Sequence, residues 1–584
     1  MSDQPNVNGG LIKFQIGPVQ SFIEAAKTIR DLWSGSYLLS WLVATAIRTV
    51  QSAEGVNATI LSPHIEKNPI LKLLEMGKGS DQVLTPCLPN HFEAAVDRDV
   101  SAAVIRSVES EWKTIGSTIK AALQSEFRQD SDDWDRDWES QVNSYLELRC
   151  VYLPPGAGDS GDRIKRLHEL MAAVRNIRHV PDYAPRPDSQ GQVGMKCTLL
   201  GTFEQVGPAQ MQTSRDYWQK RANWEGKGGT RLRTGERLCA ISLIKRFFWP
   251  AYLAAKARLD VSERRYADSA TVAAREWLRE ANIDPDDSWK NGSWSGQWLH
   301  ASTPTKDAVD EPCPDNLARA IRLAKREHGP VPTYYAILML DGDRLGALIG
   351  EHGTQSISEQ LTKFALEKAP VVVEQDHHGE LIYAGGDDVL AMVPLVNAFA
   401  CARQLNEEFR SAEIMGGFPT ATTSAGLAVV HHKEDLRFAL QQARDAEREA
   451  KNAGRDRLCL RIIRRSGEAT SVSVPWSLVE QSQKLVMDFV EPLEGATVPP
   501  SDRWTYRLRS MLPTIGHSAA MFDAELGRQL GRIESNKIHR EAFKQRIIDL
   551  KRSFVANSTE WEAIHLEFVT LCQSASFLAR GRDQ

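Results

Sequence analysis

The order of apolar and polar positions is the same in two separate segments of the chain. Residues 11–16 (LIKFQI) predict a strand, which a Gly-Pro turn and a long helical stretch follow. Residues 334–340 (YYAILML) are a continuous apolar run, typical of a buried strand, and a turn and a helix over about 356–368 follow them. Each segment therefore predicts a strand, a tight turn and a helix, and we expect the first to be an acid-free copy of the second.

The second segment continues in an order that defines a fold. Residues 381–395 (LIYAGGDDVLAMVPL) predict two apolar strands joined at Gly-Gly-Asp-Asp, which is a hairpin pattern. A helix over about 396–410 and a strand within 420–432 follow, and then a helix over 435–454 and a strand over 457–463. The first six elements, β-α-β-β-α-β, form a ferredoxin-like core, as in the palms of polymerases and cyclases.

These patterns divide the chain into four predicted parts and place it in the α+β class. The parts are an N-terminal palm-like domain with helical additions, a helical insert, the second palm and a C-terminal helical bundle. Their boundaries are 1–190, 191–330, 331–468 and 469–584. A length of 584 residues agrees with this division, since a domain has about 150 residues.

The composition is that of an ordinary globular protein. There are 71 Lys and Arg against 76 Asp and Glu, a net charge of −5, which excludes a histone-like basic protein. A nucleotide or nucleic-acid site must therefore be local. Residues 436–465 supply such a strip, with nine Lys and Arg against four acids. Eight cysteines without a C-x-x-C pair, no signal peptide and no apolar run of membrane length predict a cytoplasmic protein without a membrane partner.

The candidate chemistry lies in two pairs of aspartates. Asp341 and Asp343 follow the first strand of the second palm, and Asp387 and Asp388 lie at the hairpin tip. The first and third strands are neighbours in a ferredoxin-like sheet, so the two pairs are expected to converge. Clustered carboxylates need cations, and oxygen ligands suit Mg²⁺ or Mn²⁺. Two such ions about 4 Å apart can activate a 3′-hydroxyl and stabilise a leaving pyrophosphate.

Glycines and one lysine complete the predicted site. Gly385 and Gly386 let the backbone approach a nucleotide without a Cβ clash. Lys451, near the end of a predicted helix, can reach a triphosphate or can form an i,i+4 pair with Glu447 on a solvated helix; spacing does not separate these interpretations.

Two other motifs are candidate sites. The pair His431-His432 can contact a nucleotide or end a strand, and we favour the strand end. The G-x-G-x-x-G at 156–161 precedes a Pro-rich segment rather than a second strand, so we reject a dinucleotide fold. The sequence has no phosphate loop of the form G-x-x-x-x-G-K, no H-E-x-x-H and no His-Asp dipeptide.

A set of motifs, in order, resembles the large subunit of type III-B CRISPR (Cmr) effector complexes, in a form that lacks the N-terminal His-Asp nuclease domain. The motifs are IGPVQSFIEAAKTIRDLWSGSYLLSWL, LPNHF, WDRDWES, GERLCAISLIKR, LDGDRLG, YAGGDDVLAMVP and SAGLAVVHHK. The second palm also resembles diguanylate cyclases, in which Asp341 matches a metal ligand at a strand end and the helix around Lys451 matches in character.

The resemblance implies an RNA-activated enzyme. Such a subunit joins ATP through 3′-5′ linkages into cyclic oligoadenylates when its complex, with guide RNA and the other Cmr subunits, captures target RNA. Asp341 and Asp387 would be the principal metal ligands, and Asp388 and Asp343 would assist. Gly342, Gly385 and Gly386 would shape the nucleotide pocket, and Lys451 would hold the phosphates.

Two departures from the family pattern change these expectations. Because the His-Asp nuclease domain is missing, we expect no cleavage of single-stranded DNA by this chain. The family's insert also has two C-x-x-C pairs, which here are Cys197-Thr-Leu-Leu200 and Cys239-Ala-Ile-Ser242. One cysteine in each half is too few for a thiolate-rich zinc site, so we predict no structural zinc and an insert held by apolar packing.

Alternatives remain beside the oligoadenylate synthase. The palm can bind nucleotide without turnover, as a silent scaffold subunit of the same complex, or can make another nucleotide signal from ATP. A free-standing nucleotide cyclase would leave the rest of the chain without a role. The sequence does not predict the ring size of the product.

Overall fold

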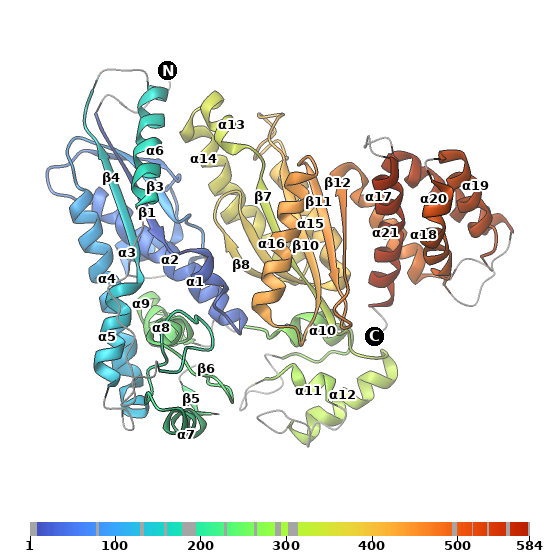
Figure 1. Cartoon of the computed structure of the whole chain (residues 1–584). Coiled ribbons are helices and arrows are strands. Elements are labelled where there is room, and N and C mark those ends of the chain that lie inside the picture. The colour runs from blue at the N-terminus through green and yellow to red at the C-terminus, as the bar shows by residue number, and fades with distance from the viewer. Residues whose placement is uncertain are drawn as a thin grey trace. The chain divides into compact units, whose positions relative to one another are not determined.

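The computed structural model groups the chain into two compact units (Figure 1). It describes residues 9–581 except 78–80, 129–132, 157–159, 178–193, 223, 227–229, 262–265, 286–293, 302–312, 493–498, 517, 534–536 and 556–560. The first unit holds residues 1–266, 344–368 and 382–387, and the second holds 267–343, 369–381 and 388–584.

The first unit is built on a four-stranded antiparallel sheet with the strand order β2-β3-β1-β4. The strands are β1 (Gly10–Gly17), β2 (Ala58–Ser62), β3 (His91–Val96) and β4 (Glu147–Leu153), and a separate small pair comprises β5 (Glu225–Gly226) and β6 (Thr230–Arg231). The helices are α1 (Gln20–Glu24), α2 (Ile29–Gln51), α3 (Pro69–Met76), α4 (Ser101–Phe127), α5 (Trp134–Tyr145), α6 (Ser160–Asn176), α7 (Met211–Arg221), α8 (Ala240–Phe248), α9 (Ala254–Ala257), α13 (Leu345–His352) and α14 (Thr354–Lys363).

Alternation along β1 explains how this sheet is covered. Ile12, Phe14 and Ile16 are buried in the large core that also contains α2 and α4, whereas Leu11 packs with Val151 against α6. Successive side chains of a strand point to opposite faces, so one strand supplies both cores. The sequence of α2 is apolar enough to be buried along most of its length.

A buried charge cluster joins α2 to the segment around α8 within the first unit. The Arg246 guanidinium lies between two buried carboxylates, with Nε 2.5 Å from Asp31 Oδ1 and Nη1 3.0 Å from Glu236 Oε2. Beside it, the buried Lys245 ammonium donates to the backbone carbonyls of Phe22 and Ala25. Pairing is what makes such burial tolerable, because an isolated charge in a core is strongly destabilising.

The second unit contains most of a six-stranded sheet with the order β12-β11-β10-β7-β9-β8. The strands are β7 (Tyr334–Gly342), β8 (Glu380–Ala384), β9 (Val389–Pro394), β10 (Thr423–His431), β11 (Arg457–Ile463) and β12 (Ala469–Pro475). The helices are α10 (Ser269–Glu280), α11 (Gln297–His300), α12 (Asp315–Glu327), α15 (Ala398–Phe409), α16 (Leu436–Asn452), α17 (Trp476–Val490), α18 (Arg503–Ile515), α19 (Ala519–Leu530), α20 (Lys537–Val555) and α21 (Trp561–Arg580).

The two sheets have the same strand order. Within each β-α-β-β-α-β segment the fourth strand neighbours the first, the first neighbours the third, and the third neighbours the second. This is the order of a ferredoxin-like sheet, so the predicted α+β class with two palm-like sheets is confirmed. Of the two, only the second has acidic residues where its first strand ends, since β1 ends at Gly17-Pro18.

Helices α15 and α16 lie on opposite faces of the second sheet. On one face, the Thr423 hydroxyl donates to Asn406 of α15 at 2.9 Å. On the other face, α16 approaches β10 so closely that a Cβ on Gly426 would overlap the backbone of Ala443 and Glu447. Glycine at position 426 is therefore what allows the helix to lie flat on the strand.

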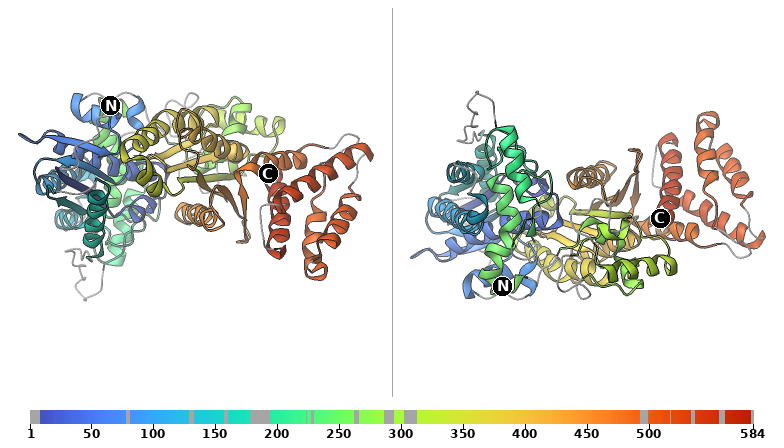
Figure 2. Two further views of the ribbon diagram at one scale, coloured as in Figure 1. Left: turned by 90° about the horizontal axis from the view of Figure 1, so that it is seen from above. Right: turned by 90° about the horizontal axis from the view of Figure 1, so that it is seen from below.

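The remaining elements form a helical bundle and an insert. Helices α17 to α21 pack against one another within the second unit (Figure 2). By contacts, residues 191–266 group with the first sheet and residues 267–330 with the second, although the sequence pattern joins them in one insert. The four predicted domain boundaries stay predictions. In the part of the chain that the structure describes, no helix is long and apolar enough to cross a membrane.

Candidate metal and nucleotide site

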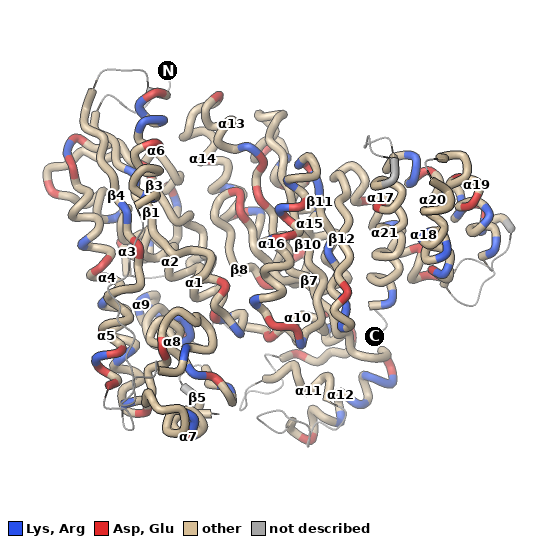
Figure 3. Tube along the Cα trace, viewed as in Figure 1, with Lys and Arg blue, Asp and Glu red and all other residues tan. Residues whose placement is uncertain are grey.

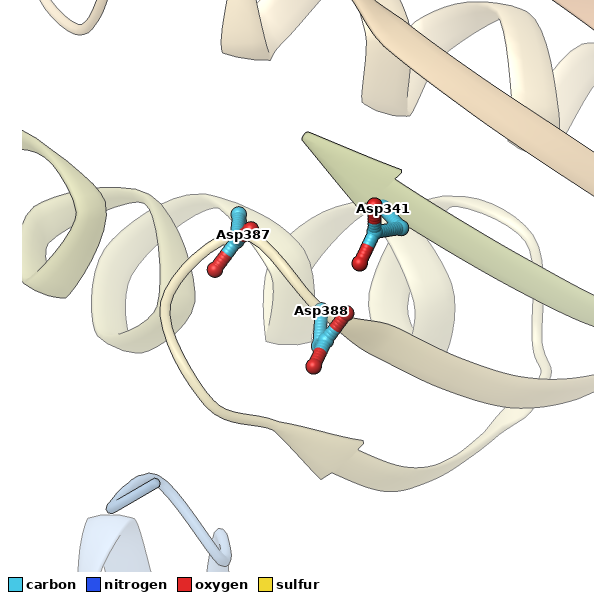
Figure 4. A group of neighbouring side chains, drawn as sticks. All are labelled: Asp341, Asp387 and Asp388. Atoms are coloured by element: carbon cyan, nitrogen blue, oxygen red, sulfur yellow. The ribbon is translucent and has the colours of Figure 1, made fainter. Parts of the chain in front are cut away.

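The ends of two neighbouring strands bring three carboxylates together. Strand β7 pairs with β9 so that Leu340 lies opposite Val389, which places Asp341 and Asp388 side by side at the next position. One carboxylate oxygen each of Asp341, Asp387 and Asp388 lies within 4.8 Å of the other two (Figure 4). The convergence expected from the strand order is therefore present for three of the four aspartates.

This group has the chemistry of a site for a hard divalent cation. Asp341 and Asp387 are half-buried and Asp388 is exposed, so a hydrated ion can reach all three. Three carboxylates at this separation repel one another, and a cation that bridges them removes the repulsion. Oxygen-only donors fit Mg²⁺ or Mn²⁺ and do not favour a thiophilic metal.

The hairpin between β8 and β9 depends on its two glycines. Gly386 has φ +102°, a backbone conformation that residues other than glycine rarely adopt. At Gly385 an added Cβ would overlap the ring of Tyr383. The glycines thus allow the turn that places Asp387 and Asp388, which is a structural reason for the motif in addition to the predicted approach of a nucleotide.

Lys451 lies directly beside the acidic group. It is in the last turn of α16, and its ammonium forms ion pairs with Asp341 and, at 2.6 Å, with Glu447. Burial lowers the pKa of Lys451, but the two carboxylates outweigh burial and raise it above its ordinary value. The predicted i,i+4 pair with Glu447 is therefore present, and the ammonium also lies beside the carboxylate group, while its contact with a triphosphate stays a prediction.

The other half of the Asp-Gly-Asp motif is placed differently. Gly342 ends β7 and pairs with Thr423 of β10. Asp343 does not belong to the group of three carboxylates. It is buried, and its oxygens accept hydrogen bonds from Thr422, Ser424 and the backbone N–H of Asp456.

These partners of Asp343 were not among the residues predicted from the sequence. Thr422 and Ser424 lie where β10 begins, opposite the end of β7. A signal for them exists in the hydroxyl-rich run TATTS, which precedes the apolar half of that strand.

The basic strip of residues 436–465, which includes Lys451, is partly neutralised. Arg448 lies 3.6 Å from Asp445 on α16, and Arg461 lies 3.5 Å from Glu449. Acidic and basic positions are interleaved along the traces of both units (Figure 3). The ammonium of Lys451 is thus distinguished by its contact with the carboxylate group rather than by membership of a strongly charged patch.

The His431-His432 pair lies at the opposite end of β10 from the acids. Strand β10 ends at His431, which pairs with Tyr334 at the beginning of β7, so the interpretation of His431-His432 as a strand end is confirmed. The ring of His432 stacks on His300 at 4.0 Å and on His431 at 4.6 Å.

The two cysteines of the insert meet at one serine. The Ser242 hydroxyl lies 3.3 Å from Cys197 Sγ and 3.4 Å from Cys239 Sγ, and all three side chains are buried. Burial raises the pKa of both thiols, but hydrogen bonds from Cys239 and Ser242 lower that of Cys197 below its ordinary value. Two thiols and a hydroxyl are a poor donor set for zinc. The absence of a structural zinc stays a prediction.

Comparison with known proteins agrees with this architecture. Residues 334–459 match the family profile described as Cas10/Cmr2, second palm domain, and residues 11–128 match CRISPR-associated protein Cmr2, N-terminal. The CRISPR system Cmr subunit Cmr2 of Pyrococcus furiosus is 26% identical over 573 aligned residues, which cover 80% of this chain and 63% of that protein. The chain thus spans less than two thirds of the length of this relative.

Two solved structures share the fold. A type III-B Cmr-beta structure in the apo state has a TM-score of 0.62 at 13% identity, covering 90% of this chain and 78% of the other. A type III-B Cmr-beta structure bound to cognate target RNA has a TM-score of 0.59 at 13% identity, covering 99% and 83%. The two profile matches lie in chain order, so residues 11–128 and 334–459 are similar to the N-terminal and second palm domains of the Cas10/Cmr2 family, and the relative and the two solved structures agree with a large subunit of the type III-B kind.

Proposed function

We propose that the chain is the catalytic subunit of a type III CRISPR effector complex and converts ATP into 3′-5′ linked cyclic oligoadenylates when target RNA is bound. The observation that carries the proposal is the group of Asp341, Asp387 and Asp388 with Lys451 beside it. The palm order of the sheet supports it, because this edge is where palm enzymes hold their metals.

Each residue has a chemical task in this proposal. The three carboxylates would hold two Mg²⁺ or Mn²⁺ ions, which would activate the attacking 3′-hydroxyl and stabilise the leaving pyrophosphate. The Lys451 ammonium lies where it can donate charge-assisted hydrogen bonds to phosphate oxygens of ATP. The Gly385-Gly386 turn and Gly342 keep side-chain bulk away from the nucleotide at the strand ends.

The proposed partners are the other Cmr subunits, guide RNA and target RNA. The match to the Cmr2 N-terminal profile supports them, and so does the RNA-bound state of one protein with the same fold. We place the RNA outside the palm, because part of the positive charge around Lys451 is already used in local ion pairs. RNA would then act by permitting turnover rather than by entering the acidic site.

A product assay tests the proposal. The assembled complex is incubated with ATP, Mg²⁺ and target RNA, and nucleotides are analysed by mass spectrometry. Pyrophosphate and a cyclic oligoadenylate are expected from the wild type and not from an Asp387→Ala/Asp388→Ala double variant that still assembles. An Asp445→Ala variant, which changes an aspartate on the outer face of α16, is the matched control. Absence of pyrophosphate release from the wild type would refute an enzymatic role.

One observation favours a second candidate, a palm that binds nucleotide without turnover. The ion pair between Lys451 and Asp341 already neutralises part of the acidic group, so a metal is not required to make the site stable. In that case ATP binds to the complex but no pyrophosphate appears. A product other than a cyclic oligoadenylate, such as another nucleotide signal made from ATP, would be identified by its mass.

A further inference from the structure

The carboxylate of Asp343 joins three strands at the edge of the second sheet. The residue is 5% exposed, and the hydroxyls of Thr422 and Ser424 donate to Oδ2 at 2.8 Å and to Oδ1 at 2.7 Å. The backbone N–H of Asp456 donates to Oδ2 at 3.1 Å. The end of β7 is thereby tied to the beginning of β10 and to the turn that precedes β11.

These donors use most of what the carboxylate can accept. An ionised aspartate offers about four lone-pair positions, and three are occupied by protein donors here. Arg455 Nε lies 4.0 Å from Oδ1 and supplies the nearest positive charge. A buried carboxylate is stable only with such partners, so its environment fits a structural tie better than a metal ligand.

The turn that Asp343 holds belongs to the same segment as Lys451. The N–H of Ala453 donates to the carbonyl of Glu449 at 2.9 Å, and the N–H of Arg455 donates to the carbonyl of Ala450 at 3.1 Å. These bonds enclose the last turn of α16, in which Lys451 lies. Fixing the N–H of Asp456 therefore fixes the end of the helix and, with it, the base of the lysine side chain.

We infer that Asp343 is a positioning residue, which holds the turn after α16 so that Lys451 faces the carboxylate group, and that it is not a metal ligand. The inference rests on the proposed function of that group. It also separates the two aspartates of Asp-Gly-Asp by role, since Asp341 faces the proposed metals while Asp343 supports the lysine.

The conservative variant Asp343→Asn distinguishes a tie from a ligand. Hydroxyls both donate and accept, so Ser424 can accept from the new amide nitrogen, while the amide oxygen still accepts from the N–H of Asp456. We expect Mn²⁺ affinity of the full chain, measured by electron paramagnetic resonance, to stay within about threefold of wild type, whereas Asp341→Asn weakens it about tenfold or more. A loss in Asp343→Asn equal to that in Asp341→Asn would overturn the inference.

Hydrogen–deuterium exchange gives a readout that does not depend on catalysis. We expect Asp343→Ala to raise hydrogen–deuterium exchange in a peptide covering residues 453–458. We also expect it to raise KM for ATP about tenfold, which corresponds to the loss of one charge-assisted contact between Lys451 and the phosphates. Asp343→Asn restores both values towards wild type, and Asp445→Asn, on the outer face of α16, changes neither. Unchanged exchange in Asp343→Ala overturns the inference. Failure of the wild type to bind Mn²⁺ or ATP would instead refute the proposed function, and the exchange comparison would still decide whether Asp343 is the tie.

Discussion

Substitution of Lys451 by methionine should change metal and nucleotide binding in opposite directions. In the structure the ammonium is paired with Asp341, and the side chains are 29% and 26% exposed, respectively. A cation that binds Asp341 must compete with this ammonium, so its removal favours the metal. The same removal deletes the group that we expect to hold the phosphates of ATP. Methionine is unbranched like lysine and replaces most of its aliphatic chain without the charge.

The magnitudes follow from the partial burial of the pair. Fully exposed pairs contribute about 0.2–1 kcal/mol and breaking buried pairs costs about 3–5 kcal/mol, so about 1.4 kcal/mol is a reasonable value here. This energy corresponds to about tenfold tighter Mn²⁺ binding in Lys451→Met. Loss of a charge-assisted hydrogen bond to phosphate, about 1.5–3 kcal/mol, corresponds to about 10- to 150-fold weaker ATP binding.

Both affinities can be measured on the same preparations. Mn²⁺ binding without nucleotide is followed by electron paramagnetic resonance, and ATP binding at saturating metal by calorimetry. Lys484→Met is the matched control, since Lys484 forms an i,i+4 pair with Glu480 at 2.8 Å on α17. It should leave both affinities unchanged. Weaker Mn²⁺ binding in Lys451→Met, or unaltered affinities for both ligands, would refute the reasoning.

Three further outcomes concern stability. Arg246→Met leaves two buried carboxylates without their cation and should lower the free energy of unfolding by about 3–5 kcal/mol, which denaturant titration would detect; a wild-type midpoint would contradict the paired-charge account. Gly426→Val forces α16 away from β10 and should lower the melting temperature and ATP binding together; loss of neither would show that the close approach is unimportant. Burial lowers the pKa of His300 to about 4 and that of His432 to about 2 in the folded protein. In the unfolded chain both histidines have the ordinary pKa of about 6.5, so below that pH the unfolded chain binds more protons than the folded protein. Stability present above pH 6.5 should therefore fall as the pH falls towards 4, and a double His300→Gln/His432→Gln variant should show a shallower fall in melting temperature.

The strand order and the meeting of the acids could be predicted from the sequence because both depend on simple periodic patterns. An apolar strand before Asp341 and a Gly-Gly-Asp-Asp hairpin fix which strand ends are neighbours in a ferredoxin-like sheet. The closeness of Asp341 and Asp388 follows from that register. Lys451 could be named as a candidate site residue, but its role could not be decided, because helical spacing made Glu447 an equally good partner. The structure shows that its ammonium contacts both Asp341 and Glu447.

The role of Asp343 could not be predicted from spacing. In a continuing strand, residues two apart share a face, which suggests that Asp341 and Asp343 act together. Strand β7 instead ends at Gly342, so Asp341 lies in the strand and Asp343 lies in the turn that follows, where Arg344 has φ +53°. The partners of Asp343 come from residues about 80 and 113 positions away along the chain, and no local pattern reports such contacts.

The split of the predicted insert has a similar cause. Its two halves are alike in helical character, so composition offers no boundary between them. The core around Cys239 and Leu243 is continuous with that of the first sheet, whereas the core around Trp277 and Leu317 is separate. Which core a helix joins depends on the helix and sheet faces that pack together, and the pattern of a single sequence does not show this pairing.

The ion pair between Lys451 and Asp341 means that the second palm carries its own counter-ion. A cluster of carboxylates that relied on bound metal alone would repel when the metal was removed, and the repulsion would destabilise the fold. Here the ion pair with Lys451 reduces that repulsion when no metal is bound. Under the proposed function, a shortage of magnesium would stop turnover without unfolding the palm, and activity would return when magnesium is supplied again.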